Sequence, residues 1–204
     1  IEINDLIDLS DHKIKASYLN KKLSLKGKGQ VKFQNKYEII QYELINKGSD
    51  LNLESNIELS ELDIKNQNLI REYLPKTKDI LNLKNHKIKL NYKDNILSLK
   101  GSGKIKLDKE FNKVGYFFST KNKRYNFETD LEINDTPFKI DFINYEKAKN
   151  LNSQLNINGN YNKKSGINFK KISLLSKNNN LIVNNLIVDK NNKLIKVDKI
   201  DLDY

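Results

Sequence analysis

Apolar and polar residues alternate with a period of two along most of this 204-residue chain. The clearest runs are "LSLKGKGQVKF" at 23–33 and "LSLKGSGKIKL" at 97–107, where every second residue is apolar or glycine. Such alternation is typical of a β-strand with one buried and one solvated face. Clusters rich in Asn, Gly and Lys separate the runs and supply turns. The pattern therefore predicts a long antiparallel meander.

The two runs belong to a longer internal repeat. Residues 12–33 align with residues 86–107 without a gap, and 12 of the 22 positions are identical. "LESNIEL" at 53–59 keeps the same 74-residue offset from "FETDLEI" at 127–133. Self-similarity at a fixed period is the signature of duplicated structural units that stack on their neighbours. The duplication predicts an elongated structure rather than a compact one.

One stretch between the repeats breaks the alternation. "NQNLIREYLPKTKDILNLKN" at 66–85 places Leu69, Ile70, Tyr73 and Leu74 at helical spacing, and Pro75 then ends the turn. The spacing predicts a short linker helix around 67–82, with a second helical turn over 76–81. The helix is expected to pack across one end or face of the sheet.

These patterns define the predicted organisation. The fold class is mainly all-β: a long, antiparallel, twisted and curled sheet of repeated units that forms a groove. Residues 1–85 form the first β-repeat unit plus the linker helix, and residues 86–150 form the second unit. Residues 151–204 add further strands to the same sheet. The chain begins with Ile and shows no signal peptide, so it is expected to be a continuous fragment of a larger protein.

The glycines of the repeated runs share one register. Glycine inside a strand marks a bulge, a bend or a close approach by another group. Two interpretations are open: the glycines are twist points where the sheet curls, or they leave room on a concave face for a guest chain. The four residues that fall on the apolar register are Gly27, Gly29, Gly101 and Gly103.

No residue pattern indicates catalysis. The chain has no Cys, no phosphate-binding loop and no dinucleotide fingerprint, so we expect a protein that is not an enzyme and has no cofactor. His12 and His86 occupy equivalent repeat positions, and duplicated structural roles account for them without a metal. Asp201 and Asp203 share one strand face, where a solvated face is a simpler interpretation than a weak cation site. Catalytic and metal-binding residues are therefore expected to be absent.

Charge changes this picture only slightly. The formal net charge is +11, yet the positive residues are almost all Lys, and the two arginines are Arg71 and Arg124. Arginine is the residue that binds phosphates and guanine edges in two-pronged fashion, so no nucleic-acid partner is expected. The abundance of Lys, Asn and Ile is typical of A/T-rich coding sequence. A role at anionic lipid headgroups stays open as an alternative.

The combination of patterns resembles a known family. The residues that carry the likeness are the repeated "YxxxxLSLKGxGxIKL"-like strands, "EYLPKTKDIL" at 72–81, and "LIVDKNNKLIKVDKIDLDY" at 186–204. They resemble the AsmA-like superfamily, and within it the large YhdP- and TamB-type bridge-like lipid transfer proteins of Gram-negative bacteria. The likeness spans essentially the whole chain and is one of pattern, because these families have no catalytic signature.

The resemblance implies a function. The parent protein would be anchored in the inner membrane and extend through the periplasm as a β-groove. This segment would bind or conduct phospholipid acyl chains toward the outer membrane and contribute to outer-membrane lipid homeostasis. The alternative is a structural or adhesive β-repeat module with a closed core and no ligand. The predicted lipid-facing residues are Leu23, Leu25, Val31, Phe33, Leu53, Ile57, Leu97, Leu99, Ile105, Leu107, Phe127 and Leu131.

Overall fold

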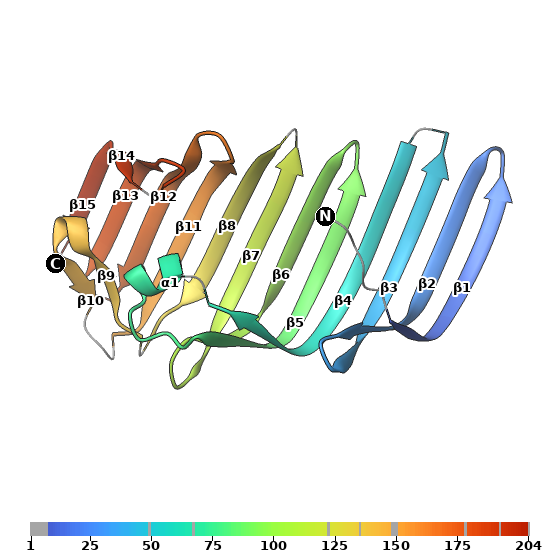
Figure 1. Ribbon diagram of the computed structural model, residues 1–204, viewed down its shortest axis with the longest axis horizontal. Helices are drawn as coiled ribbons and strands as arrows, with labels where there is room; N and C mark the ends of the chain where they lie inside the picture. Colours follow the sequence, from blue (N-terminus) through green and yellow to red (C-terminus); the bar gives the residue numbers. More distant parts are fainter. Residues whose placement is uncertain are drawn as a thin grey trace.

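The structure is a computed structural model that describes residues 8–48, 50–66, 68–121, 123–134, 136–147, 151–177, 179–191 and 193–203. Its main element is one open antiparallel sheet of 13 strands, in which each strand pairs with the next along most of the chain (Figure 1). The prediction of a mainly all-β, curled antiparallel sheet is confirmed. Its strands are β1 (Leu9–Leu19), β2 (Lys22–Phe33), β3 (Lys36–Lys47), β4 (Asp50–Lys65), β5 (Ile80–Lys93), β6 (Ile96–Lys106), β7 (Phe111–Lys121), β8 (Arg124–Glu132), β11 (Ser153–Asn162), β12 (Gly166–Ser176), β13 (Asn180–Val188), β14 (Leu194–Lys196) and β15 (Lys199–Asp203).

The sequence repeat corresponds to a unit of four strands. We call β1–β4 the first unit and β5–β8 the second unit. The tight turns are also repeated: Asn20 and Lys21 both have positive φ, as do Asp94 and Asn95 at the equivalent positions. Two consecutive residues of positive φ make the hairpin turn whose twist matches that of the flanking strands. Local turn chemistry therefore helps to set the strand register in both units.

A β-bulge interrupts the first strand of each unit. The pairing shifts between Ser10 and Lys13 in β1, and between Lys84 and Lys87 in β5. Asp11 and Asn85, which lie inside these shifts, have φ of +52° and +54°. Asp and Asn tolerate this left-handed conformation better than most residues. The extra residue lets apolar side chains before and after the bulge stay on the same face of the sheet.

Three short elements cover part of one face. They are the helix α1 (Asn68–Tyr73), the small hairpin of β9 (Phe138–Ile140) and β10 (Tyr145–Lys147), and the 3-10 turn η1 (Asp141–Ile143) between those two strands. Figure 1 shows α1 and the β9–β10 hairpin lying over the part of the sheet nearer the C-terminus. The main core forms beneath them, from Leu81 at the start of β5 to Leu186 in β13.

The core is made of fully or nearly fully buried apolar side chains. Its members come from the sheet and the residues that directly follow its strands, from the turn after α1, and from the β9–β10 hairpin. They are Leu74, Leu81, Leu107, Val114, Leu131, Ile133, Phe138, Ile140, Tyr145, Leu155, Ile172, Leu174, Leu181, Val183 and Leu186. No member of this cluster comes from the first unit, so the two units differ in how far they are covered.

The linker differs from its prediction. Helix α1 ends at Tyr73, and the predicted second turn over 76–81 is wrong, because β5 begins at Ile80. Pro75 disfavours helical conformation at the residue before it. After it, Thr77 donates its backbone N–H to Leu74 and its hydroxyl to the same carbonyl, which closes a turn instead of a helix. Strand β5 also runs through residue 85, the predicted end of the first unit.

Candidate functional site

The sheet has an apolar face and a polar face, and the strand registers assign each residue to one of them. The apolar face of β2 carries Leu23, Leu25, Val31 and Phe33, and pairing extends this face from β1 to β15. All twelve residues predicted to face lipid lie on the apolar face. The alternation along each strand accounts for this, because neighbouring side chains point to opposite faces.

The twelve predicted residues differ in accessibility. Leu107 and Leu131 are 1% and 8% exposed and belong to the covered core, and Val31 is 6% exposed. The other nine are half-buried. Five of the nine lie in the first unit, whose apolar face has no covering layer among the described residues, so side-by-side packing within the face produces their partial burial. Leu107 and Leu131 are therefore core residues in this chain.

A continuous apolar strip crosses the sheet at right angles to the strands, in the half away from α1. Two pairing ladders make it: Leu25–Leu44–Leu53–Tyr92–Leu97, and Leu90–Leu99–Phe118–Phe127. We call these nine residues the apolar strip. They are half-buried, except Phe118, which is 36% exposed and counts as exposed. At about 4.8 Å between neighbouring strands, the seven strands from β2 to β8 give the strip a length of roughly 30 Å.

Aromatic rings of the chain itself lie over the glycines of the repeated runs. A Cβ atom added to Gly27 would stand 2.1 Å from the ring of Tyr42, and one added to Gly101 would stand 2.4 Å from the ring of Tyr116. Neither distance leaves room for a side chain. The interpretation that these glycines leave space for a guest chain is therefore wrong, since tyrosines of neighbouring strands occupy that space.

Histidine rings fill the equivalent space above the second glycine of each run. A Cβ atom added to Gly29 would meet His12 at 2.3 Å, and one added to Gly103 would meet His86 at 2.4 Å. His86 is 1% exposed, with its Nδ1 3.0 Å from the Tyr116 hydroxyl and its Nε2 2.9 Å from the Lys104 carbonyl. Both ring nitrogens of His86 are thus engaged within the protein, and the residue has a structural setting.

A buried polar side chain follows the same repeat. Glu38 is 3% exposed and accepts hydrogen bonds from the Ser60 backbone N–H and hydroxyl, both at 2.7 Å. Asn112, 74 positions later, is 4% exposed, and its Oδ1 accepts from the Asn134 backbone N–H at 3.4 Å. Buried polar side chains need such partners, because an unpaired polar group away from water costs about 1–3 kcal/mol. Each side chain accepts a hydrogen bond from a backbone N–H, that of Ser60 near the end of β4 and that of Asn134 just after β8.

The hairpin turns beside the apolar strip are basic. Five turns, those of β1–β2, β3–β4, β5–β6, β7–β8 and β11–β12, lie along the edge of the sheet away from α1 (Figure 1). Residues 19–23, 46–51, 92–96, 120–125 and 161–166 contain nine Lys and Arg against two Asp. We call this edge the basic rim. Its cationic residues are Lys21, Lys22, Lys47, Lys93, Lys121, Lys123, Arg124, Lys163 and Lys164, all exposed.

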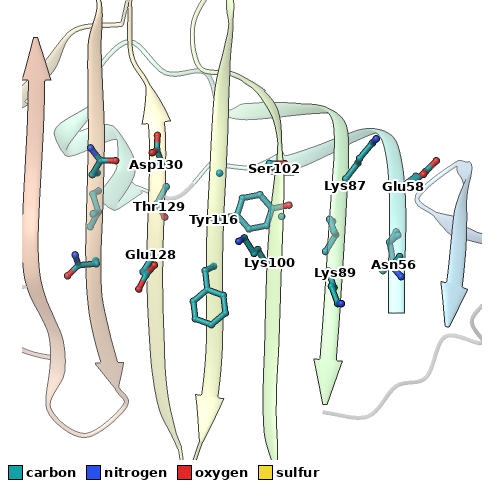
Figure 2. Close-up of a pocket in the computed structure, with 18 of the residues that line it drawn as sticks. Asn56, Glu58, Lys87, Lys89, Lys100, Ser102, Tyr116, Glu128, Thr129 and Asp130 are labelled. Carbon is teal, nitrogen blue, oxygen red and sulfur yellow. The ribbon is translucent and has the colours of Figure 1, made fainter. Parts of the chain in front are cut away.

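A hollow of about 790 Å³ opens on the polar face over β4–β8 and β11. Figure 2 shows its side chains on successive strands, with Lys87, Lys89 and Lys100 on β5 and β6 and Glu128 and Asp130 on β8. The strand between them, β7, has Gly115 on this face, opposite Ser102 and Asp130, and so leaves the floor open. The hollow carries both charge signs. It lies on the opposite side of the sheet from the apolar strip.

The described residues contain no group of three or more His, Cys, Asp or Glu side chains that could hold a metal ion. Asp201 lies on the polar face of β15 with Asp203 and pairs with Lys199 at 2.7 Å. Burial raises the pKa of the Tyr116 phenol above its ordinary value, which keeps this hydroxyl protonated beside His86. In the described part, no helix has both the length and the apolar character needed to cross a membrane.

Comparisons with known proteins add no relative. No family model matches the chain, no curated protein matches it, and no solved structure matches it.

Sequence reasoning did not identify the ring–glycine contacts, the buried Glu38 and Asn112, or the basic rim. A signal for the first two existed in the 74-residue offset, which also relates Tyr42 to Tyr116 and Glu38 to Asn112. The rim required the strand pairing, because its lysines are spread over 150 residues and converge only when successive hairpins stack.

Proposed function

We propose that the chain is a non-enzymatic, lipid-binding segment of a longer β-sheet protein, and that its apolar strip holds phospholipid acyl chains. The observation that supports this is the continuity of the strip: apolar side chains from seven successive strands lie next to one another and keep part of their surface in contact with solvent. Exposed apolar surface of this extent marks an interaction site more often than an ordinary surface.

The strip is suited to acyl chains for an energetic reason. Each methylene group removed from water gains about 0.8 kcal/mol, and this gain needs no directed polar contact. The strip contains only Leu, Phe and Tyr, so an acyl chain lying along it meets the same chemistry at every strand. Such a surface would bind tails without fixing their position, which would allow them to slide along the long axis of the sheet.

The basic rim can bind the phosphate groups of the lipid headgroups. It borders the strip at the hairpin ends, where Lys21 and Lys123 lie in the turns themselves, whereas Lys22 and Lys93 at the strand ends are on the polar face. A phospholipid with tails on the strip can therefore bring its phosphate to a lysine, where opposite charges attract. The hollow on the polar face cannot serve that lipid, since the sheet lies between them. Phospholipid acyl chains are thus the proposed partner.

The cellular setting of this proposal follows the resemblance. The parent protein would be anchored in the inner membrane, this segment would lie in the periplasm, and acyl chains would pass toward the outer membrane. The basic rim and open strip are compatible with that arrangement.

Native mass spectrometry with lipid extraction tests the proposal. The variant Leu53→Asp/Leu97→Asp places two carboxylates in the middle of the strip, where an unpaired charge is costly for an acyl chain to cover. The matched control Asn52→Asp/Ser98→Asp adds the same charge one residue away, on the polar face. We expect phospholipid on the wild type and the control and its loss from the strip variant, with circular dichroism showing all three folded. A folded wild type without lipid would contradict the proposal.

A second candidate function is a structural or adhesive module without a ligand. The observation that favours it is the cover over the second unit: α1 and the β9–β10 hairpin turn part of the same apolar face into an ordinary core. If further segments of a parent protein covered the strip in the same way, no lipid would reach it. A lipid-free, stable wild type in the experiment above would support this candidate.

A further inference from the structure

Strands β1 and β5 begin the two units and have similar sequences, but among the described strands only β5 has a neighbour on its outer edge. Strand β5 pairs with β4, with Lys87 opposite Glu58 and Lys89 opposite Asn56, and Lys89 forms a salt bridge with Glu54. Strand β4 thus offers apolar residues on the apolar face and acidic residues on the polar face. A basic strand meets an acidic strand in this pair, and opposite charges across neighbouring strands stabilise it.

Strand β1 shows the same lysines without the acidic neighbour. Lys13 and Lys15 are the repeat equivalents of Lys87 and Lys89, and both are exposed. On the apolar face, Ile14 is 58% exposed and Tyr18 is 72% exposed. Within the described residues β1 pairs only with β2. The outer edge of this 11-residue strand has no partner among the described strands, and such an edge is a template for pairing with another strand.

The opposite end of the sheet carries a strand of the complementary type. Strand β15 pairs with β13 and, among the described strands, has no neighbour on its other side. Its sequence alternates as β4 does, with Ile200 and Leu202 on the apolar face and Asp201 and Asp203 on the polar face. Leu202 is 41% exposed. On the polar face, β1 therefore carries Lys13 and Lys15, and β15 carries Asp201 and Asp203.

Strand direction permits the two ends to pair. The sheet has twelve strand positions, because β14 and β15 both pair with β13 on the same side, and every pairing is antiparallel. With an even number of positions, β1 and β15 run in opposite directions. A second copy placed beside the first by translation would therefore set its β1 antiparallel to β15, with the two apolar faces on the same side.

We propose that this edge binds a second copy of the chain, with β15 of one copy pairing with β1 of the next. In the register we assign, Asp203 lies opposite Lys13 and Asp201 opposite Lys15, while Leu202 lies opposite Ile14 on the apolar face. Asp201, which forms a salt bridge with Lys199 within the chain, would face Lys15 of the other copy in this register. The contact is head-to-tail, so it continues the sheet and extends the apolar strip from copy to copy.

Sedimentation velocity on the 204-residue chain, over a range of concentrations at low and high salt, tests this proposal. We expect reversible, concentration-dependent assembly that weakens as salt screens the charges. Charge reversal supplies the specific test. Lys13→Glu/Lys15→Glu and Asp201→Lys/Asp203→Lys should each weaken self-association by about tenfold or more. An equimolar mixture of the two variants should assemble again, because each acidic edge then meets a basic edge.

A matched control separates this contact from general charge effects. Lys100→Glu/Lys104→Glu on the interior strand β6 makes the same change in net charge as Lys13→Glu/Lys15→Glu and should assemble like the wild type. Circular dichroism of every variant checks that the sheet is retained. Three outcomes would overturn the proposal: a wild type that stays monomeric at high concentration and low salt, assembly insensitive to reversal at the two edges, or a mixture that fails to recover assembly.

Discussion

The first and second units share a sequence pattern, the hairpin turn between their first two strands and a bulge in the first strand, yet only the second contributes to the covered core. Tyr18 in β1 is 72% exposed, whereas its equivalent Tyr92 in β5 is half-buried because β4 pairs alongside. At the other end of the strands, Phe33 is half-buried and its equivalent Leu107 is 1% exposed. The repeat therefore specifies a sheet, and the segments outside it decide where that sheet is closed.

This difference has a physical origin in layering. A single β-sheet buries side chains only against their neighbours on the same face, so most of its apolar face stays half-exposed. Helix α1 and the β9–β10 hairpin add a second layer over the sheet between the start of β5 and β13, and the large buried cluster forms there. Among the described residues of the first unit, Val31 and Leu59 are buried apolar side chains, at 6% and 4% exposed, but they lie outside that cluster. The same residue type at equivalent positions thus serves as core in one unit and as accessible surface in the other.

The largest expected difference concerns core packing. Leu107→Ala should lower the free energy of unfolding by about 2–5 kcal/mol, since it opens a cavity under the covering layer. Phe33→Ala at the equivalent position should cost only about 1 kcal/mol, because the side chain is already half in water. Urea unfolding of both variants measures this. Equal losses would contradict the claim that only the second unit has a covered core.

The buried acceptors Glu38 and Asn112 should differ in the opposite sense, with the larger loss of unfolding free energy in the first unit. Glu38→Ala should cost about 1–3 kcal/mol of unfolding free energy, because it removes a buried carboxylate together with the hydrogen bonds that it accepts from the Ser60 backbone N–H and hydroxyl. Asn112→Ala should cost about 1 kcal/mol, since the hydrogen bonds that it removes, one from the Asn134 N–H at 3.4 Å and one to the Glu110 carbonyl at 3.3 Å, are both long. Glu38→Gln, which keeps one acceptor oxygen, is the control and should fall between wild type and Glu38→Ala.

The ring–glycine contacts offer a smaller contrast. Gly103→Ala should destabilise by about 1–3 kcal/mol, because His86 is buried and held through both ring nitrogens. Gly29→Ala should cost less than about 1 kcal/mol, since His12 is half-buried on the edge strand and can turn outward. Thermal and urea unfolding would show the difference, and a larger loss for Gly29→Ala would refute it.

The smallest effect involves the two tyrosines that cover Gly27 and Gly101. Tyr116→Phe should cost about 1 kcal/mol by removing the bond to His86, and Tyr42→Phe should be nearly neutral, as no hydrogen bond to its hydroxyl occurs in the described part.

Burial raises the pKa of Tyr116, so the folded state keeps a proton that the unfolded state loses above about pH 10. Its contribution is present below that pH and falls as pH rises further.

Comparing urea unfolding at about pH 8 and about pH 10.5 checks this sign. The wild type should lose more stability between the two values than Tyr116→Phe does. An equal loss would mean that Tyr116 does not contribute to the alkaline decline.

The regular parts of the fold were predictable because their causes are local. Alternation predicted the strands and the apolar face, and the 74-residue offset predicted the duplicated units. The linker helix was predicted too long, because the strand pairing of Ile80 with Lys65 overrides the helical spacing after Pro75. The rings over Gly27 and Gly103 were not predicted: the 74-residue offset relates the rings of the two units to each other, but Tyr42 and His86 reach these glycines from neighbouring strands, and only the register places them there.

By itself, the sequence determined which side of each strand is apolar, because side chains alternate faces whatever the surroundings. It also determined the tight turns, since Asn and Asp there accept positive φ at low cost. The tertiary structure alone decided which apolar residues become core and which remain an accessible strip. That outcome depends on where α1 and the β9–β10 hairpin pack and on which strand lies beside each edge, and these are relations between distant segments that no local pattern contains.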